Sequence, residues 1–325
     1  MLRRTVVSGL GLAGLAMMAR MPVEAAIPKT GVVVFGAPAG AIGTKLAGLT
    51  IEQLRTDYHL DYSLVVNDTR NGRAAAEMVK DAVPDGATLL QAQSSSIVLF
   101  PSTYKSLSYD PLRDFVPLTI LGTYGYSLVL GSAVPVTVNT VHDYLSWVAQ
   151  NPDLREVGFT LYGSQSHLLC LMLARESGVA LRPMGYTSAR SLFDDLAGQT
   201  LSAAFAVSGN VPILAKQGVR AISITSPHRL VNLPHIATFQ ESGFSALNLT
   251  GWYGWFAPSN TPADVVSEQA TKLSALTEGL AYGKKLDALL IERDTSTPPQ
   301  IRERMRRETM QYAQLVKDYR LPTLG

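Results

Sequence analysis

The first hundred residues alternate apolar runs with amphipathic segments, and this alternation constrains the fold more than any other feature. The apolar runs at 32–35, 64–66 and 88–90 predict short strands. Residues 44–58 and 73–82 carry apolar side chains at helical spacing, and a Pro-Asp-Gly turn follows the second of these segments. This order of strands and helices predicts an α/β fold, in which helices cover a parallel sheet.

Small or hydroxyl-bearing residues follow the first and third predicted strands. Residues 36–43 are mostly Gly, Ala and Pro, so backbone amides there can approach a ligand closely, and the helix after Gly43 points its positive end into this loop. Residues 94–96 are three serines. Ligands of parallel sheets bind at the carboxyl ends of the strands, so both loops are candidate ligand loops. Taken alone, the first loop is equally consistent with an ordinary strand-to-helix connection.

The second half of the chain repeats this arrangement. Residues 158–162 predict a strand, 163–167 (GSQSH) a small polar loop, and the residues from there to Glu176 a helix. The apolar stretch 115–130 predicts two strands that cross to a second lobe, and 251–258 predict the return crossing. The other expected elements are helices at 141–149, 188–196, 262–276 and 298–319 and strands at 203–207 and 219–224.

The first 26 residues have the pattern of an export signal. Arg3 and Arg4 precede an apolar segment at 6–19 that is too short to span a bilayer, and Ala25 and Ala26 are small enough for cleavage. The paired arginines fit a twin-arginine signal and the remaining pattern fits a general secretory signal, so the export route stays open. We therefore expect an exported protein, the alternative being an N-terminal anchor that stays in place.

The charge balance argues against anionic polymers as partners. Of the 28 basic and 26 acidic residues, the leader holds Arg3, Arg4, Arg20 and Glu24, so the remaining chain has 25 of each. A neutral chain has no electrostatic attraction to nucleic acid or to an anionic membrane. No G-x-x-x-x-G-K-[ST] motif indicates a nucleotide site. Arginine and glutamate alternate at 302–308, which predicts a salt-bridged, solvent-exposed helix face.

The reactive residue types form no catalytic pattern. Cys170 is the only cysteine, which excludes an intramolecular disulfide, and its apolar neighbours predict a buried thiol. Ser166 and His167 are adjacent, but adjacent side chains on a helix point apart, and the G-x-S-x-G motif of hydrolases is absent. Asp194 and Asp195 are also adjacent on a predicted helix, so their carboxylates lie on different faces and are not expected to form a catalytic pair. The histidines lack metal-ligand spacing, so we expect no catalysis, no metal and no cofactor.

Five motifs follow one another along the chain: 84–90 (PDGATLL), 108–117 (SYDPLRDFVP), 163–168 (GSQSHL), 232–244 (NLPHIATFQESGF) and 255–262 (WFAPSNTP). In this order they resemble the motifs P-D-G-x-T-L-L, P-Y-D-P-x-x-D-F-x-P, G-S-x-S-x-H-L, L-P-D-V-P-T-x-x-E-x-G and F-A-P-x-G-T-P. These motifs are typical of the periplasmic solute receptors of tripartite tricarboxylate transporters, the Bug family. The third motif is one residue shorter here, and the resemblance covers nearly the whole chain after the leader.

The resemblance implies a periplasmic binding protein-like fold of type II, with two α/β lobes joined by two crossover strands and a ligand cleft between them. It assigns 1–26 to a signal peptide, 27–125 to lobe 1, 126–250 to lobe 2, and 251–325 to the return into lobe 1 and the C-terminal helices. It implies a monomeric periplasmic receptor that closes on a small carboxylated solute and delivers it to the permease subunits of a tripartite tricarboxylate transporter. The alternatives are a solute sensor that feeds a signalling partner and, less favoured, a hydrolase.

The resemblance also implies which loops of the two lobes hold the solute. Gly43 and Ala206 stand where the family often carries an acidic residue, so we infer a plain or aromatic carboxylate without an ammonium group. Tyr124 and Tyr253 offer aromatic surface near the crossovers, although core packing explains them equally well. The implied ligand-binding residues are Pro38, Ala39, Gly40, Gly43, Ser94, Ser95 and Ser96 in lobe 1 and Gly163, Ser164, Ser166, His167, Tyr186 and Thr187 in lobe 2.

Overall fold

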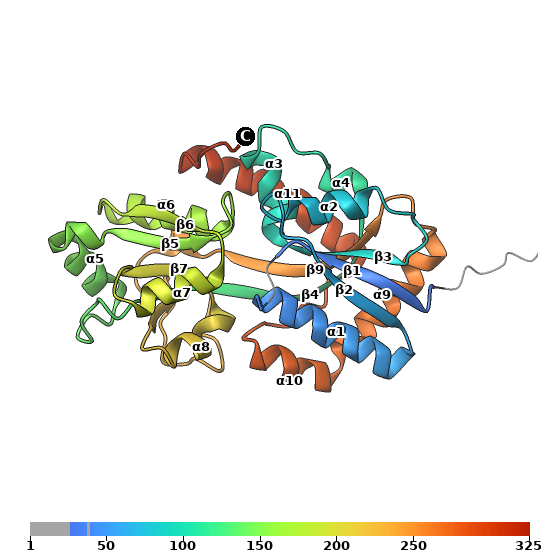
Figure 1. Ribbon diagram of the computed structural model, residues 1–325, viewed down its shortest axis with the longest axis horizontal. Coiled ribbons are helices and arrows are strands. Elements are labelled where there is room, and N and C mark those ends of the chain that lie inside the picture. The colour runs from blue at the N-terminus through green and yellow to red at the C-terminus, as the bar shows by residue number, and fades with distance from the viewer. Residues whose placement is uncertain (1–26, 38–39) are drawn as a thin grey trace, which may run out of the picture.

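Two lobes lie side by side (Figure 1). The computed structural model describes residues 27–37 and 40–325. The predicted export signal at 1–26, and Pro38 and Ala39 of the first predicted ligand loop, lie outside the described residues.

Lobe 1 begins with the alternation that the sequence predicts. Its first elements are β1 (Thr30–Phe35), α1 (Ile42–Tyr58), β2 (Asp61–Val66), α2 (Arg73–Lys80) and β3 (Thr88–Gln93). The strand β1 lies between β2 and β3 and is parallel to both. Val33 and Val34 are fully buried, as expected for a strand that helices cover on both faces.

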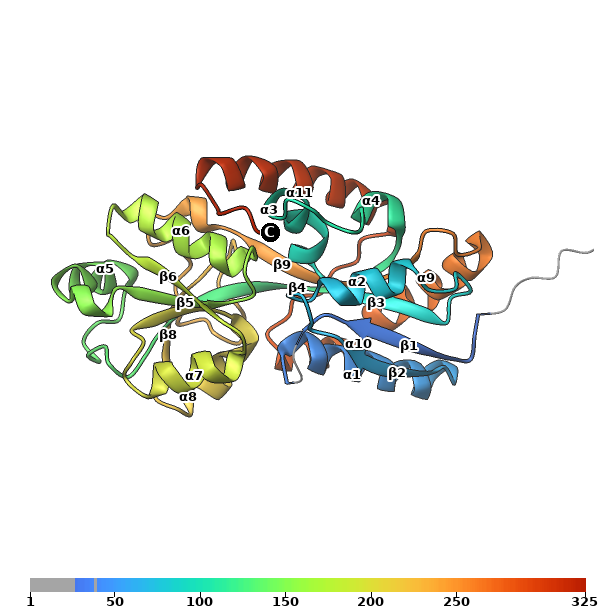
Figure 2. The same ribbon diagram turned by 45° about the horizontal axis from the view of Figure 1, so that its top comes forward.

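Two long strands, β4 (Phe115–Leu130) and β9 (Thr250–Pro258), pair antiparallel and run from one lobe to the other (Figure 2). The prediction of two separate strands at 115–130 is wrong, because β4 is continuous over all 16 residues. At Gly122 and Gly125 a Cβ atom would collide with Glu292 and Ser226. These glycines therefore allow the close approach of neighbouring segments and do not interrupt the strand.

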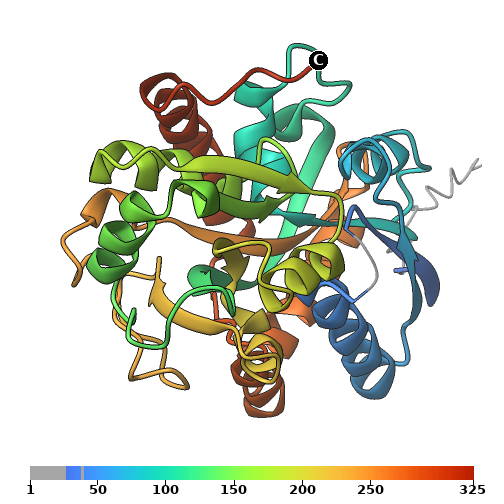
Figure 3. The same cartoon turned by 60° about the vertical axis from the view of Figure 1, so that its left-hand side comes forward.

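Lobe 2 extends the sheet from the other half of β4, and helices cover both of its faces (Figure 3). Its elements are α5 (Val141–Gln150), β5 (Glu156–Thr160), α6 (Gln165–Ser177), β6 (Arg182–Tyr186), α7 (Ala189–Ala197), β7 (Ala203–Val207), α8 (Val211–Ala215) and β8 (Arg220–Ile224). The sheet runs β2-β1-β3-β9-β4-β7-β5-β6, and β8 pairs with β4. The strand β6 is not predicted from the sequence, because it is an edge strand whose sequence RPMGY lacks alternation and contains a proline, which an edge strand tolerates.

The C-terminal region adds three helices, of which α11 runs along both lobes (Figure 2). They are α9 (Ala263–Glu278), α10 (Leu280–Ala288) and α11 (Pro298–Asp318). The side chain of Arg304 on α11 is only 17% exposed and pairs with Asp294 and Glu308, so the predicted solvent face is wrong at this residue. Among the helices of residues 27–37 and 40–325, none combines the length and the apolar composition that a membrane span requires.

Short helical turns complete the fold. They are the π-helix η1 (Ser95–Leu99), α3 (Phe100–Thr103), α4 (Pro111–Asp114), and the 3-10 turns η2 (Pro152–Leu154), η3 (Ser208–Asn210) and η4 (Ser245–Leu247). The expected serine loop at 94–96 is wrong, because β3 extends to Gln93 and helical structure begins at the next residue, Ser94, which leads into η1.

Candidate functional site

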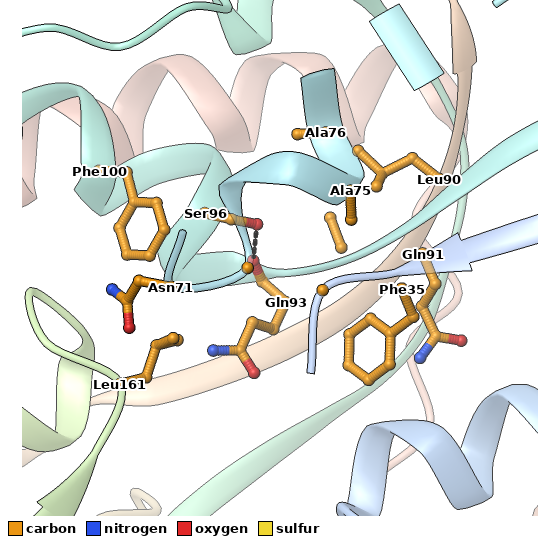
Figure 4. A pocket seen from close by; sticks show the side chains of 13 residues that line it. Phe35, Asn71, Ala75, Ala76, Leu90, Gln91, Gln93, Ser96, Phe100 and Leu161 are labelled. Atoms are coloured by element: carbon orange, nitrogen blue, oxygen red, sulfur yellow. Dashed lines mark hydrogen bonds between the residues drawn. The ribbon is translucent and has the colours of Figure 1, made fainter. Parts of the chain in front are cut away.

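A pocket lies at the carboxyl ends of β1 and β3, beside the start of α2, and Leu161 of lobe 2 closes one side (Figure 4). Its open volume is about 10 Å³, which is room for about one water molecule. The polar side chains that line it are Asn71, Gln91, Gln93 and Ser96. Among the described residues, no charged side chain lines this pocket, so a ligand there meets amides, hydroxyls and apolar groups.

Next to this pocket, Gln165 at the start of α6 joins the two lobes. Its Oε1 accepts hydrogen bonds from Ser94 Oγ at 3.0 Å and Ser95 Oγ at 3.4 Å, and its backbone N–H donates to Ser95 Oγ at 3.3 Å. Its Nε2 donates to the Thr250 carbonyl at 3.0 Å and to the Tyr312 hydroxyl. In this arrangement Ser94 and Ser95, which the resemblance implies as ligand-binding, bind the other lobe.

The third serine of the group, Ser96, lies differently. Its hydroxyl donates to the Gln93 carbonyl at 2.8 Å, and the residue lines the pocket. The structure therefore brings Ser96 to the pocket and places Ser94 and Ser95 at the contact between the lobes.

The serines at the start of α6 cap that helix. Ser164 is the N-cap residue and accepts a hydrogen bond from the His167 N–H at 3.4 Å. The hydroxyls of Ser164 and Ser166 lie 2.9 Å apart, and each donates to the Thr160 carbonyl at 3.1 Å. The predicted GSQSH loop is thus held in place by its own hydroxyl groups.

His167 is buried and neutral. Its ring stacks on Phe159 with 4.2 Å between the ring centroids, and burial lowers its pKa to about 4. The backbone N–H of Gly163, whose φ is 71°, donates to His167 Nδ1 at 3.3 Å. The neutral ring therefore carries its proton on Nε2 and can donate one hydrogen bond.

Tyr186 and Thr187, which the resemblance places in the site, are not among the residues that line the pocket. The Tyr186 hydroxyl donates to Asp195 Oδ2 of α7 at 2.8 Å, and burial together with this carboxylate raises the Tyr186 pKa. Thr187 is exposed in the turn before α7. The structure thus gives Tyr186 a partner within lobe 2.

Gly43 packs against aromatic rings of the protein. A Cβ atom at this position would lie 2.5 Å from the Phe35 ring and 2.7 Å from the Tyr253 ring. The Gly43 carbonyl accepts a hydrogen bond from Gln91 Nε2 at 2.6 Å. The absence of a side chain at Gly43 therefore lets α1 begin close to β9. At Gly40, by contrast, a Cβ atom would meet nothing within 4 Å, and the backbone has a φ of 84°.

Aromatic rings of the crossover strands form a layer beside this contact. Tyr124 stacks on Tyr253 with 4.6 Å between the centroids and meets the edge of Tyr126 at 5.5 Å. The Tyr126 hydroxyl donates to Gln165 Oε1 at 3.3 Å. These tyrosines connect the start of α1 to the start of α6 through the crossover strands.

The polar residues of this region that the sequence did not predict are Asn71, Gln91, Gln93 and Gln165. Asn71 and Gly72 follow β2 in a turn-rich loop directly before α2, so the argument applied to the other loops would have found them. Gln165 lies inside the GSQSH motif, but its distant partners leave no local signal.

Comparison with known proteins places the chain in a family. The model of the tripartite tricarboxylate transporter family receptor matches residues 59–318. The UPF0065 protein of the tcbD-tcbE intergenic region of Pseudomonas sp. is 27% identical over 327 residues, covering 98% of this chain and 95% of that protein. BugT of Bordetella pertussis is 24% identical over 254 residues, covering 76% of each chain.

Solved structures share the fold. The structure of R. palustris Rpa4515 with adipate has a TM-score of 0.86 at 22% identity, covering 91% of this chain and 99% of that one. MatC from Rhodopseudomonas palustris with bound malate has a TM-score of 0.79 at 22% identity, covering 88% and 98%. Because the family model spans most of the sequence, the chain belongs to the tripartite tricarboxylate transporter receptor family, whose members bind solutes and are not enzymes.

Proposed function

We propose that this receptor captures a small carboxylated solute between its lobes and presents it to the permease subunits of a tripartite tricarboxylate transporter. It acts as a monomer in the periplasm after removal of the 1–26 leader. The observation that carries the proposal is the meeting of loops from both lobes around Gln165 and the adjacent pocket, in a chain of this family. The structural neighbours Rpa4515 and MatC, which hold adipate and malate, support the solute class.

Capture proceeds by lobe closure about β4 and β9. We assign 27–125 and 251–325 to lobe 1 and 126–250 to lobe 2, so that the crossover strands form the hinge. Loops from both lobes approach one another only in the closed arrangement, so a solute that contacts both stabilises closure by its differential affinity. The carboxylate is held by backbone amides of the predicted loop 38–40, by Ser96 and by the Nε2–H of His167.

The solute carries no ammonium group. No acidic side chain is among the described residues that line the pocket, and Gly43 is packed too tightly against Phe35 and Tyr253 to be replaced by an acid without rearrangement. A buried ammonium group without an anionic partner is costly. We infer a plain or aromatic carboxylate, whose oxygens can accept hydrogen bonds from the amides and hydroxyls that line this pocket.

A thermal-shift panel tests the proposal. Adipate, malate and benzoate are compared with glutamate and with adipamide, the neutral diamide of adipate. A solute at 100 times its Kd adds about 2.7 kcal/mol to the free energy of unfolding, so at least one plain carboxylate should raise the Tm while adipamide leaves it unchanged. Stabilisation by glutamate alone would contradict the solute class, and no shift with a wide set of carboxylates would contradict the receptor function.

A further inference from the structure

The residues with unusual backbone conformations point to one place between the lobes. In the described part of the chain, seven non-glycine residues have a positive φ. Arg70 and Asn71 (φ 52° and 60°) lie in the loop before α2, and Leu161 (φ 67°) lies in the loop before α6 of the other lobe. Asn71 and Leu161 both line the pocket. The other four follow the ends of helices, where this conformation is common: His59, Gln199, Leu290 and Arg320.

Left-handed backbone is costly for residues other than glycine and persists where surrounding contacts fix it. At Asn71 those contacts are visible. Its Nδ2 donates to the Tyr104 hydroxyl at 2.5 Å within lobe 1 and to the Tyr162 carbonyl at 2.7 Å in lobe 2. The Asn71 carboxamide therefore uses both of its N–H groups, and one of them crosses between the lobes. In Figure 4 this side chain lies between Phe100 and Leu161 at the edge of the pocket.

Both acceptors of Asn71 are held by their own lobes. The guanidinium carbon of Arg73 lies 4.0 Å from the centroid of the Tyr104 ring, and Phe100 packs on the same ring with 4.9 Å between centroids. In lobe 2, a Cβ atom at Gly185 would collide with the Tyr162 ring, so that ring lies directly on β6. The Asn71 bond thus joins two fixed points, one in each lobe.

We propose that Asn71 is a positioning residue for solute capture, which latches the loop at 161–163 of lobe 2 onto lobe 1 beside the bound solute. This inference rests on the proposed receptor function. Asparagine suits the role because it tolerates the left-handed conformation and carries two donors on one nitrogen. Glycine tolerates the conformation but has no side chain, and aspartate has the shape but no donor. Breaking the latch should speed solute release and leave the association rate unchanged.

The experiment compares the full mature protein with Asn71→Gly and Asn71→Asp. Asn67→Asp is the matched control, because it makes the same chemical change in the same loop. In the wild type Thr69 Oγ1 donates to Asn67 Oδ1 at 2.7 Å, and the aspartate keeps this acceptor. Tyr104→Phe removes only the partner within lobe 1. Spin labels on Lys45→Cys of α1 and Arg190→Cys of α7, both exposed, report the distance between the lobes, and the buried Cys170 stays unlabelled.

Without solute, Asn71→Gly and Asn71→Asp should increase the population of long label distances, whereas Asn67→Asp should match the wild type. The dissociation rate of adipate, or of the best binder in the carboxylate panel, should rise about three- to ten-fold in both Asn71 variants, with a smaller rise for Tyr104→Phe. Wild-type distances and release rates in Asn71→Gly, in a protein with unchanged circular dichroism, would overturn the latch. If no carboxylate binds, the receptor proposal fails, while the label distances still decide the latch.

Discussion

The Gln165 side chain contacts residues up to 147 positions away in the chain. Its amide forms hydrogen bonds at the start of η1, with both crossover strands and with α11. This one residue at the start of α6 therefore fixes the position of lobe 2 relative to these elements. This role cannot be predicted from the sequence, because no local sequence pattern shows that a glutamine side chain will contact distant segments. The adjacent Ser164 and His167 were easier to find, since capping and stacking depend on near neighbours.

At the same scale, His167 should make stability depend on pH. Its pKa is about 4 in the folded protein, below the usual 6.5, so folding favours the neutral ring. This stabilisation is fully present above pH 6.5 and is lost as the pH falls toward 4, by up to about 3 kcal/mol. Urea unfolding at several pH values measures the free energy of unfolding of the wild type and of His167→Gln. The difference between the two proteins should decrease as the pH falls from 6.5 toward 4. Parallel curves for the two proteins would contradict the buried neutral ring.

Gly43 provides a packing prediction. Gly43→Asp forces a side chain against the Phe35 and Tyr253 rings and buries a carboxylate, which should lower the free energy of unfolding by about 3 kcal/mol. Gly48→Asp is the control on the same helix, because a Cβ there meets nothing within 4 Å, and it should change stability by less than about 0.5 kcal/mol. Equal melting temperatures for the two variants would show that the site accepts an acid.

Among the elements, α11 holds the hinge region together. Arg304 on this helix pairs with Asp294 at 2.8 Å and Glu308 at 2.6 Å, and Glu308 accepts the indole N–H of Trp252 on β9 at 2.8 Å. At its end α11 reaches lobe 2, where the Tyr319 hydroxyl donates to Glu176 at 2.7 Å. This helix therefore ties one crossover strand to both lobes.

The ion pairs of α11 give a matched pair of variants. Arg304→Met leaves two largely buried carboxylates without their cation and should cost about 2 to 3 kcal/mol of unfolding free energy. Arg306→Met removes an exposed pair with Glu303, 3.6 Å apart, and should cost less than about 1 kcal/mol. Chemical denaturation measures both. A similar small loss in both variants would mean that the Arg304 pairs contribute little to stability.

Elements with strong local patterns were predictable, and those fixed by distant contacts were not. The apolar run of β1 and the helical spacing of α1 identified both. The π-helix η1 escaped prediction because Ser94 and Ser95 at its start find their partners in α6 and β9. The strand β6 escaped because an edge strand needs neither alternation nor a continuous apolar run.

For the whole molecule, the two-lobed fold followed from motifs that span the chain, whereas the detailed site depends on how the lobes meet. Five motifs in order were enough to indicate the family, which the match over 59–318 confirms. The contacts of Ser94 with Gln165 and of Asn71 with Tyr162 form only when the lobes come together, so no local pattern encodes them. The placement of the solute among these contacts stays a prediction.

The most direct test of the central claim is native mass spectrometry of the mature protein purified from the periplasm, followed by identification of what unfolding releases. We predict one small organic acid per chain, retained in the folded protein and freed on denaturation, with a mass that matches a carboxylate from the stabilising set. A protein that carries no acid and gains no mass on incubation with carboxylates would contradict a receptor that closes on a carboxylated solute.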